Sequence, residues 1–553
     1  MSKRNLKRIL CGILSAALLI GLIGCGPQIG DKETTKAPEQ TKAPDEGKTD
    51  APTDAPTQGG DEVAEITYPL DTDVKLKWWS VGELKHESAF NSPEECPFHV
   101  GLEKNTGVDI EWEFSPQGVD DNQGYSLMIT EDKLPHLIHF WSTAAQAEEL
   151  IQEDLIYDLT EYLPKYAPDY WELINSDPQY LEACRTASGA IYKFCSGVES
   201  GYNITYMGLA IRKDWLDECK LEIPVTLEDW EKVLATFEEK YGAKFSSPKL
   251  GFGMASGTGA FADKAATWYI ENDKVTFANT KDEYKNYLTT LNKWYNEGWM
   301  DPDILTNDSA AIRTKCLNNE VGAMYISSSA FRNILADAEE TGAEWIGVPH
   351  PVTKEGESVT WIQTRKINLA GKGTMITKSC SEEELIVALK LLNYAYTEEG
   401  NMYWNFGDEG VSYTLDANGN PQWTDLITKS EVGTNTAYTY YISSGPCIQS
   451  EYIIRMLNPG VAGDAIDQWT YNTDVARNQY MPVLNLTADE GTAYTDKWSA
   501  ISTEVSANIS KFIFGDRSLN EWDDFVATLE TMGLAECQKI QQAAYDRWLE
   551  RVK

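Results

Sequence analysis

Basic residues are scarce in this sequence. Its 553 residues include 47 Lys and Arg against 86 Asp and Glu, which gives a formal net charge of −39 at pH 7. Affinity for nucleic acid comes mainly from clustered Lys and Arg side chains that displace counterions from phosphates. The composition therefore excludes a nucleic-acid partner, and the overall negative field favours a neutral solute over an anionic one.

Histidines are few, and recognisable catalytic motifs are missing. The sequence contains only five histidines, and it has neither a G-x-S-x-G elbow nor a G-x-x-x-x-G-K-[ST] loop. His136 and His139 fall three apart in an expected strand, where their side chains point to opposite faces and cannot chelate one metal. We predict no catalytic residue, no metal site and no cofactor. Because acidic residues are so numerous, the sequence does not exclude a pair of carboxylates that acts as in a glycosidase.

Cysteines at metal or redox spacing are also missing. Apart from Cys11 and Cys25, eight cysteines are spread along the chain without a C-x-x-C pair. Cys184 and Cys195 flank Gly189 as though across a hairpin. A disulfide between them and two isolated thiols are both compatible with this spacing.

The N-terminus has the features of a secretory signal. Basic residues at positions 3, 4, 7 and 8 precede an apolar run from Ile9 to Ile23, which is too short for a membrane-spanning helix. The run ends in Leu22-Ile23-Gly24-Cys25, which resembles the lipobox of bacterial lipoproteins. We therefore expect a signal peptide over 1–24, lipidation of Cys25 and a disordered tether over 25–65, rich in Thr, Pro, Lys and Asp.

Short apolar strands alternate with amphipathic helices in the rest of the chain. The patterns predict strands over 74–79 and 134–141, and helices over 226–241, 382–397, 499–512 and 519–549, the last with a break near Gly533. Thr226 and Asp229 are spaced as a helix cap. The stretch 416–420 (DANGN) has the first residues of a calcium loop, but its twelfth position is Ile427, so we expect a turn between two strands. The alternation favours an α/β fold with parallel sheets.

Several segments resemble one family. Residues 208–230 (GLAIRKDWLDECKLEIPVTLEDW) are similar to a signature of family 1 extracellular solute-binding proteins, the maltose-binding-like receptors of ABC sugar importers. Residues 134–143, 402–413 and 512–548 resemble the larger lipoprotein members of that family. Some of these relatives carry a calcium loop after the helix that follows the signature, but 241–247 (YGAKFSS) has no carboxylate there, so we expect no calcium at that position.

The resemblance implies a type II periplasmic-binding-protein-like fold, in which two interleaved α/β lobes close on a ligand about a hinge. It assigns 66–205 and a return over 361–480, with a family-specific insertion, to lobe 1. It assigns 206–360 and most of the C-terminal helices, 481–553, to lobe 2.

By position in such a fold, the residues expected to line the cleft lie at strand ends and in the loops that follow them. Aromatic rings would stack on sugar C–H faces, while hydroxyl and carboxylate groups would bind the sugar hydroxyls. The expected ligand-binding residues are Trp79, Glu83, Trp141, Ser142, Thr143, Tyr206, Ser256, Thr258, Ser328, Ser329, Trp361, Trp404 and Tyr413.

The function that the resemblance implies is capture of an oligosaccharide and its delivery to the transmembrane subunits of an ABC importer. The protein would be a non-catalytic monomer, anchored by lipid to the outer face of the cytoplasmic membrane of a Gram-positive type of cell. Two alternatives remain: a receptor for a peptide or other organic solute, and a cell-surface carbohydrate-active enzyme.

Overall fold

A computed structural model describes residues 66–552 except 82–88, 91, 117, 132, 199–206, 249–267, 360–368, 370 and 444. The expected signal peptide, Cys25 and the tether lie outside these residues. Thr67–Lys553 form one unit by their internal contacts. Within the described part, no helix is both long enough and apolar enough to cross a bilayer.

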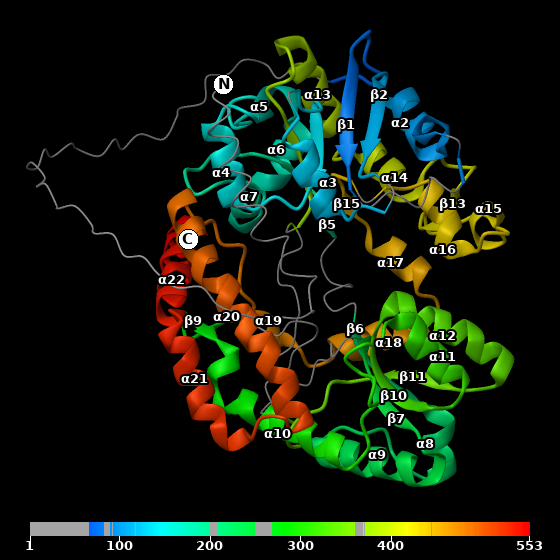
Figure 1. The fold of residues 1–553 in the computed structure, drawn as a ribbon. Helices are drawn as coiled ribbons and strands as arrows, with labels where there is room; N and C mark the ends of the chain where they lie inside the picture. Colours follow the sequence, from blue (N-terminus) through cyan, green and yellow to red (C-terminus); the bar gives the residue numbers. More distant parts are fainter. Residues whose placement is uncertain are drawn as a thin grey trace, which may run out of the picture. The chain divides into compact units, whose positions relative to one another are not determined.

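The first sheet has five strands in the order β2-β1-β3-β12-β4 (Figure 1). Strand β1 pairs in parallel with both β2 and β3, whereas β12 runs antiparallel to β3 and to β4. The alternation in β1 buries Leu76 and Trp78 on one face, and both belong to a core that also contains residues of the covering helices. The strands are β1 (Lys75–Ser80), β2 (Asp109–Phe114), β3 (Leu137–Phe140), β4 (Phe194–Cys195) and β12 (Gly373–Ile376).

Eight helices accompany this sheet along the described chain, and α13 packs on β1, α5 and α6. Asn393 of α13 accepts hydrogen bonds from the backbone N–H groups of Asp169 and Tyr170 (3.0 and 3.2 Å), which satisfies donors at the start of α6. The helices are α2 (Pro97–Thr106), α3 (Asp121–Met128), α4 (Ala144–Gln152), α5 (Leu163–Tyr166), α6 (Pro168–Asn175), α7 (Pro178–Cys184), α13 (Glu382–Tyr394) and α14 (Glu398–Phe406).

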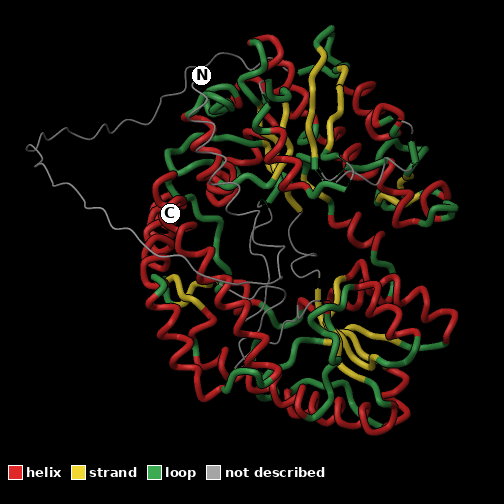
Figure 2. Tube along the Cα trace, in the orientation of Figure 1, coloured by secondary structure: helices red, strands yellow, loops and turns green. Residues whose placement is uncertain are grey.

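The second sheet has four strands in the order β11-β6-β10-β7. Only the β10–β7 pair is parallel, because β6 runs antiparallel to both of its neighbours. Figure 2 shows the strands of both sheets in yellow among red helices. The strands are β6 (Met207–Arg212), β7 (Lys244–Ser246), β10 (Val321–Ser327) and β11 (Trp345–Val348), and the helices between and after them are α8 (Lys213–Cys219), α9 (Leu227–Tyr241), α10 (Asp282–Asn296), α11 (Ser309–Leu317) and α12 (Ser328–Thr341).

The C-terminal helices pack mainly with the second sheet and its helices. Side chains of α20 and α21 belong to the core that contains β6 and α10, and α20 contacts α10. Helix α22 contacts both α7 and strand β9 of a small hairpin. These elements are α20 (Ala488–Phe514), α21 (Trp522–Thr531), α22 (Leu534–Val552), β8 (Trp268–Glu271) and β9 (Lys274–Phe277).

Residues 361–480 do not all return to the first sheet as expected. Helix α18 (Val461–Thr470) packs on β11 and β6, and Trp469 Nε1 donates to the backbone oxygen of Leu209 (2.8 Å). Gly208 makes room for this indole, since a Cβ there would lie 2.1 Å from Trp469 Cγ. The remaining elements of this stretch are β13 (Tyr413–Leu415), β14 (Pro421–Trp423), α15 (Asp425–Thr428), α16 (Thr434–Ala437), β15 (Ile448–Gln449), which pairs with β5 (Gly197–Val198), α17 (Glu451–Leu457) and α19 (Asp474–Asn478).

The local predictions are largely confirmed. Thr226 and Asp229 form a complete capping box at the start of α9. Gly533, with φ of +100°, separates α21 from α22. Asp416 accepts backbone hydrogen bonds within the turn that joins β13 to β14, as expected for 416–420. The expectation of parallel sheets is wrong, because both sheets are mixed.

Cys184 and Cys195, whose pairing the sequence leaves open, lie together in the core of the first sheet. Their sulfur atoms are 2.7 Å apart, and both side chains are fully buried. The hydroxyl of Tyr170 donates to Lys193 O (2.8 Å) and accepts from the backbone N–H of Cys195 (3.1 Å). These bonds hold β4 in place.

Candidate functional site

Three chain segments meet at one edge of the first sheet. Phe140, the last residue of β3, pairs with Gly373, the first residue of β12, and Gly373 also pairs with Cys195 at the end of β4. Trp141, which follows β3, and Lys372, which precedes β12, are therefore brought together. Ser196 follows β4 and donates its backbone N–H to Lys372 O (3.1 Å). Because β12 runs antiparallel to β3 and β4, the residue that precedes β12, Lys372, lies at the same edge as the residues that follow β3 and β4.

A cavity of about 230 Å³ opens at this edge. Its walls come from the three segments above, from α14 and from the β5–β15 pair. The lining residues are Trp141, Ser196, Gly197, Val198, Gly371, Lys372, Trp404, Asn405, Ile442, Ser443, Gly445, Cys447, Gln449 and Ile453. This mixture of aromatic, amide and hydroxyl groups is typical of a site for a small polar organic ligand.

Trp141 offers the most accessible aromatic surface in this cavity. Its residue surface is 43% exposed, although most large apolar side chains nearby are buried. Its ring packs against that of Phe140 in an edge-to-face arrangement, with the centroids 5.7 Å apart at 72°. Lys372 Nζ lies 4.5 Å from the ring centroid, a cation–π contact that orients the indole.

Trp404 forms the floor of the cavity from α14, and only 2% of its surface is exposed. Gly445 lies against its ring, where a Cβ would come within 2.4 Å of Trp404 Cζ3. The neighbouring Asn405 donates to Ile448 O (2.9 Å) and accepts from the backbone N–H of Ser450 (2.7 Å). Ser196 Oγ donates to Gly445 O (2.8 Å), so the polar wall is held by bonds to the backbone.

Lys372 is the one charged side chain among the lining residues that the structure describes. Burial raises the pKa of the Cys447 thiol to about 12, so this lining group is neutral at physiological pH. Burial also raises the pKa of Tyr125, stacked on Phe140 behind the site, to about 12. Across residues 66–552, leaving aside the gaps given above, no group of three or more His, Cys, Asp or Glu is arranged to hold a metal.

Two further predicted residues directly follow Trp141 but have structural roles. Thr143 caps α4 in a capping box with Gln146. Ser142 is buried, and its backbone oxygen accepts a hydrogen bond from the Tyr192 hydroxyl (3.2 Å). Neither belongs to the cavity lining.

Trp79 and Tyr413 are packed into the interior. Trp79 is 3% exposed, and its ring lies 6.1 Å from both Tyr125 and Phe140. Tyr413 is buried beside Phe406, at 5.5 Å between centroids. In this arrangement neither ring presents a face to a ligand.

Ser328 and Ser329 lie at the start of α12, at the end of β10 in the second sheet, and outside the cavity at Trp141. Five predicted residues lie outside the described part of the chain: Glu83, Tyr206, Ser256, Thr258 and Trp361. Of the thirteen predicted residues, the structure thus brings Trp141 and Trp404 together in one cavity.

Sequence reasoning missed the polar members of the lining. Ser196, Lys372, Asn405 and Gln449 were not predicted, although all four border the cavity. Lys372 had a usable signal, because it directly precedes the apolar run 373–376. Only the antiparallel pairing of that run with β3 places Lys372 at the ligand edge.

The described part of the chain thus combines two mixed sheets with flanking helices, and a cavity with apolar and polar lining opens at an edge of the first sheet. Comparison with solved structures shows the same fold. The alginate-binding protein AlgQ2 without calcium matches with a TM-score of 0.69 at 20% identity, covering 87% of this chain and 100% of that one. An HMO-binding, ABC-transporter-associated solute-binding protein from Bifidobacterium longum infantis matches with a TM-score of 0.69 at 20% identity, covering 86% of this chain and 99% of that one.

The sequence profile of bacterial extracellular solute-binding proteins matches residues 101–428, and this chain belongs to that family. Lipoprotein LipO of Bacillus subtilis is 25% identical over 476 residues, covering 82% of this chain and 89% of that protein. The fructooligosaccharide ABC transporter substrate-binding protein FusA of Streptococcus pneumoniae is 22% identical over 526 residues, covering 87% and 92%. The resemblance in the sequence is thereby confirmed at the level of the family.

Proposed function

We propose that this protein captures a neutral oligosaccharide, of which one sugar unit occupies the cavity formed by Trp141 and Trp404, and delivers it to the transmembrane subunits of an ABC importer. The observation that carries the proposal is the exposed indole of Trp141 beside amide and hydroxyl groups. A flat aromatic face suits the C–H face of a sugar ring, and amides and hydroxyls suit its hydroxyl groups. FusA, a relative across most of the chain, is named for binding fructooligosaccharides.

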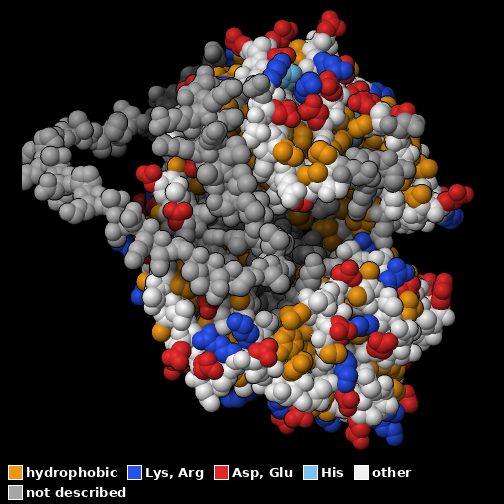
Figure 3. Space-filling model, in the orientation of Figure 1, with side chains coloured by type: hydrophobic (Ala, Val, Ile, Leu, Met, Phe, Trp, Pro, Cys, Tyr) orange, Lys and Arg blue, Asp and Glu red, His pale blue; other side chains and the backbone are white. Residues whose placement is uncertain are grey.

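The charge of the chain supports a neutral ligand. The net charge of −39 repels anionic solutes at a distance. Figure 3 shows Asp and Glu side chains scattered over the visible face, with Lys and Arg between them. Lys372 is the feature that would favour an anionic sugar, and the Trp141 ring already covers one side of its ammonium group. Uronate oligosaccharides are therefore the informative comparison.

The test is a thermal-shift screen of the purified protein with neutral oligosaccharides, uronate oligosaccharides and short peptides, followed by calorimetric titration of each hit. A ligand at 100 times its Kd stabilises the folded state by about 2.7 kcal/mol, which is easily seen in such a screen. We expect a neutral oligosaccharide to raise the transition temperature. A shift with peptides alone would contradict the carbohydrate assignment.

The absence of catalysis is part of the proposal. Prolonged incubation of the protein with the oligosaccharide that it binds should leave the sugar intact by chromatography. Release of shorter products would instead favour a carbohydrate-active enzyme.

Anchoring through Cys25 completes the proposal, with the protein held as a monomer at the outer face of the cytoplasmic membrane. The Leu-Ile-Gly-Cys sequence at 22–25 supports it, and LipO is named as a lipoprotein. The Cys25→Ala variant should lose the lipid and leave the membrane fraction. Retention of the unlipidated variant in that fraction would contradict the anchor.

A further inference from the structure

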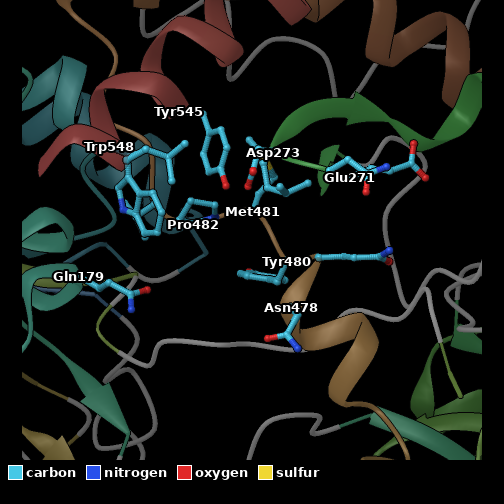
Figure 4. Close-up of a pocket in the computed structure, with 14 residues that line it drawn as sticks. Gln179, Glu271, Asp273, Asn478, Tyr480, Met481, Pro482, Tyr545 and Trp548 are labelled. Atoms are coloured by element: carbon cyan, nitrogen blue, oxygen red, sulfur yellow. The ribbon is translucent and has the colours of Figure 1, made fainter. Parts of the chain in front are cut away.

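A second and larger cavity lies away from the Trp141 site and shares no lining residue with it. It measures about 730 Å³, within the range of about 300–1,000 Å³ that is usual for sites of small organic ligands. Its walls come from α22, from the turn of the β8–β9 hairpin, from residues 478–483 and from Gln179 of α7 (Figure 4). The function proposed above makes no use of it.

One wall of this cavity is aromatic and flat. Tyr545 and Trp548 are three residues apart on α22 and therefore project from the same side of the helix. Their ring centroids are 5.7 Å apart, and the ring planes differ by only 13°. Ile270, Met481 and Leu549 pack in the same apolar cluster. In Figure 4, Tyr480 lies across the space from these two rings, and it is 36% exposed.

The polar lining consists of amides and carboxylates. Gln179 and Asn478 contribute amides, while Glu271 and Asp273 contribute carboxylates, and no Lys or Arg occurs among the lining residues within the described ranges. Amides donate and accept hydrogen bonds, and carboxylates accept them from hydroxyl groups. An anionic ligand would meet two negative charges without a cation in the wall. The lining thus suits a neutral ligand rich in hydroxyl groups.

The geometry of the rings separates two ligand classes. A quaternary ammonium ion is best held by a box of rings that face it from several sides. Trp548 instead stacks on Tyr545, which is only 5% exposed, so this wall offers mainly the Trp548 ring to a ligand. A single flat ring suits the apolar face of a sugar ring.

The walls are tied together in the absence of a ligand. Gln538 Nε2 donates to Val275 O (2.6 Å), and Val275 N–H donates to Gln542 Oε1 (2.8 Å), so α22 is bonded to β9. Ile270 N–H donates to Gln479 O (2.8 Å), which joins residues 478–483 to the hairpin. A site formed in advance loses little ordering free energy on binding.

We propose that this cavity is a second carbohydrate-binding site, which takes a unit of about one or two neutral sugar rings between Trp548 and Tyr480. It is independent of the oligosaccharide assignment at Trp141, since the two cavities have separate linings. The chain would then bind two sugar units at separate places.

The test uses the mature chain and a panel of maltose, sucrose, lactose and cellobiose, with choline and galacturonate as comparison ligands. Binding is followed by ligand-observed NMR and calorimetry. The Trp141→Ala background weakens the first site without touching the second, so that failure of either site is recognised separately. We expect at least one neutral disaccharide to bind in this background.

Adding Tyr480→Ala to that background should weaken the binding at least 10-fold, and Trp548→Ala should do the same. Tyr471→Ala is the matched control, because Tyr471 is also an exposed tyrosine (63%) but does not line the cavity. Circular dichroism checks that each variant is folded. If the Trp548→Ala variant does not fold, the Tyr480→Ala variant alone decides the test. The proposal is overturned if no neutral sugar binds in the Trp141→Ala background, if only choline or galacturonate binds, or if Tyr480→Ala behaves like Tyr471→Ala.

Discussion

The replacement Trp141→Ala tests most directly whether the edge of the first sheet holds the solute. The Trp141 surface is 43% exposed in the free protein. A tryptophan can bury about 200 Å² in total, so about 90 Å² of its surface remains for a ligand to cover. At about 25 cal/mol per Å², covering this surface contributes about 2 kcal/mol, which corresponds to about 30-fold in Kd.

The same replacement also removes surface that is already buried, so the variant loses stability as well as affinity. The remaining surface, about 110 Å², sets an upper limit of about 3 kcal/mol on that loss. Trp171→Ala provides a matched control, because Trp171 is a half-buried tryptophan of α6 that packs on the core of the first sheet but does not line the cavity. Its stability should fall in a similar way.

The assay is calorimetric titration of both variants with the best oligosaccharide from the screen, at a temperature well below both unfolding transitions. We expect a Kd about 30-fold weaker for Trp141→Ala and a Kd near that of the unmodified protein for Trp171→Ala. Equal affinity of the two variants would refute the assignment of Trp141 to the binding surface.

Three further predictions concern charge and packing. Lys372→Gln should change the Kd for a neutral sugar by less than about threefold, since Lys372 Nζ already lies over the Trp141 ring and glutamine also offers a hydrogen-bond donor; a large loss, measured by titration, would show that the ammonium charge is needed for binding. Asp301 is 2% exposed, and its two carboxylate oxygens accept hydrogen bonds from Lys315 Nζ at 2.7 and 2.9 Å. Burial raises the pKa of Asp301, but this ion pair and further hydrogen bonds outweigh burial and leave the pKa below its ordinary value. Asp301→Asn should therefore cost about 3 kcal/mol in urea unfolding at pH 7, whereas Asp303→Asn, on the same lysine but 64% exposed, should cost less than about 1 kcal/mol. Because a lowered carboxyl pKa stabilises the fold above the unfolded value of about 4, the deficit of Asp301→Asn should shrink as the pH falls below about 4, and a constant deficit would contradict the ion-pair explanation. Gly208→Ala should cost about 1–3 kcal/mol or more in urea unfolding, because the new Cβ would lie 2.1 Å from Trp469 Cγ; an unchanged midpoint would show that α18 can move away.

Local features of the fold were predictable because local sequence determines them. The capping box at Thr226 depends on residues three apart, and the helix break at Gly533 depends on one residue with positive φ. The family resemblance supplied the large-scale arrangement. Strand direction was not predictable in this way, because apolar alternation is the same in parallel and antiparallel strands. The antiparallel pairing of β12, and with it Lys372, was therefore missed.

Packing between segments that are distant along the chain was also not predictable from the sequence. Gly208 within an apolar strand gave no indication that an indole from residue 469 covers it. A sequence pattern identifies which face of an element is apolar, but it does not identify the partner that covers that face. The location of α18 on the second sheet follows from this pairing.

The contrast between Trp79 and Trp141 shows how finely strand ends decide which residues can meet a ligand. Trp79 lies within β1, and Ile138 of β3 pairs beside it, so its ring is enclosed by Tyr125 and Phe140. The last residue pair of β3 with β12 joins Phe140 and Gly373. Trp141 lies one residue beyond this pair, where no strand residue flanks it. Its ring therefore contacts Lys372 and Phe140 and leaves surface free for a ligand. A shift of one residue in the register of β3 against β12 would reverse the side on which this indole lies, because successive side chains of a strand point to opposite faces. The position of the strand end, rather than the presence of an aromatic residue near it, thus makes Trp141 the stronger candidate for contact with the solute.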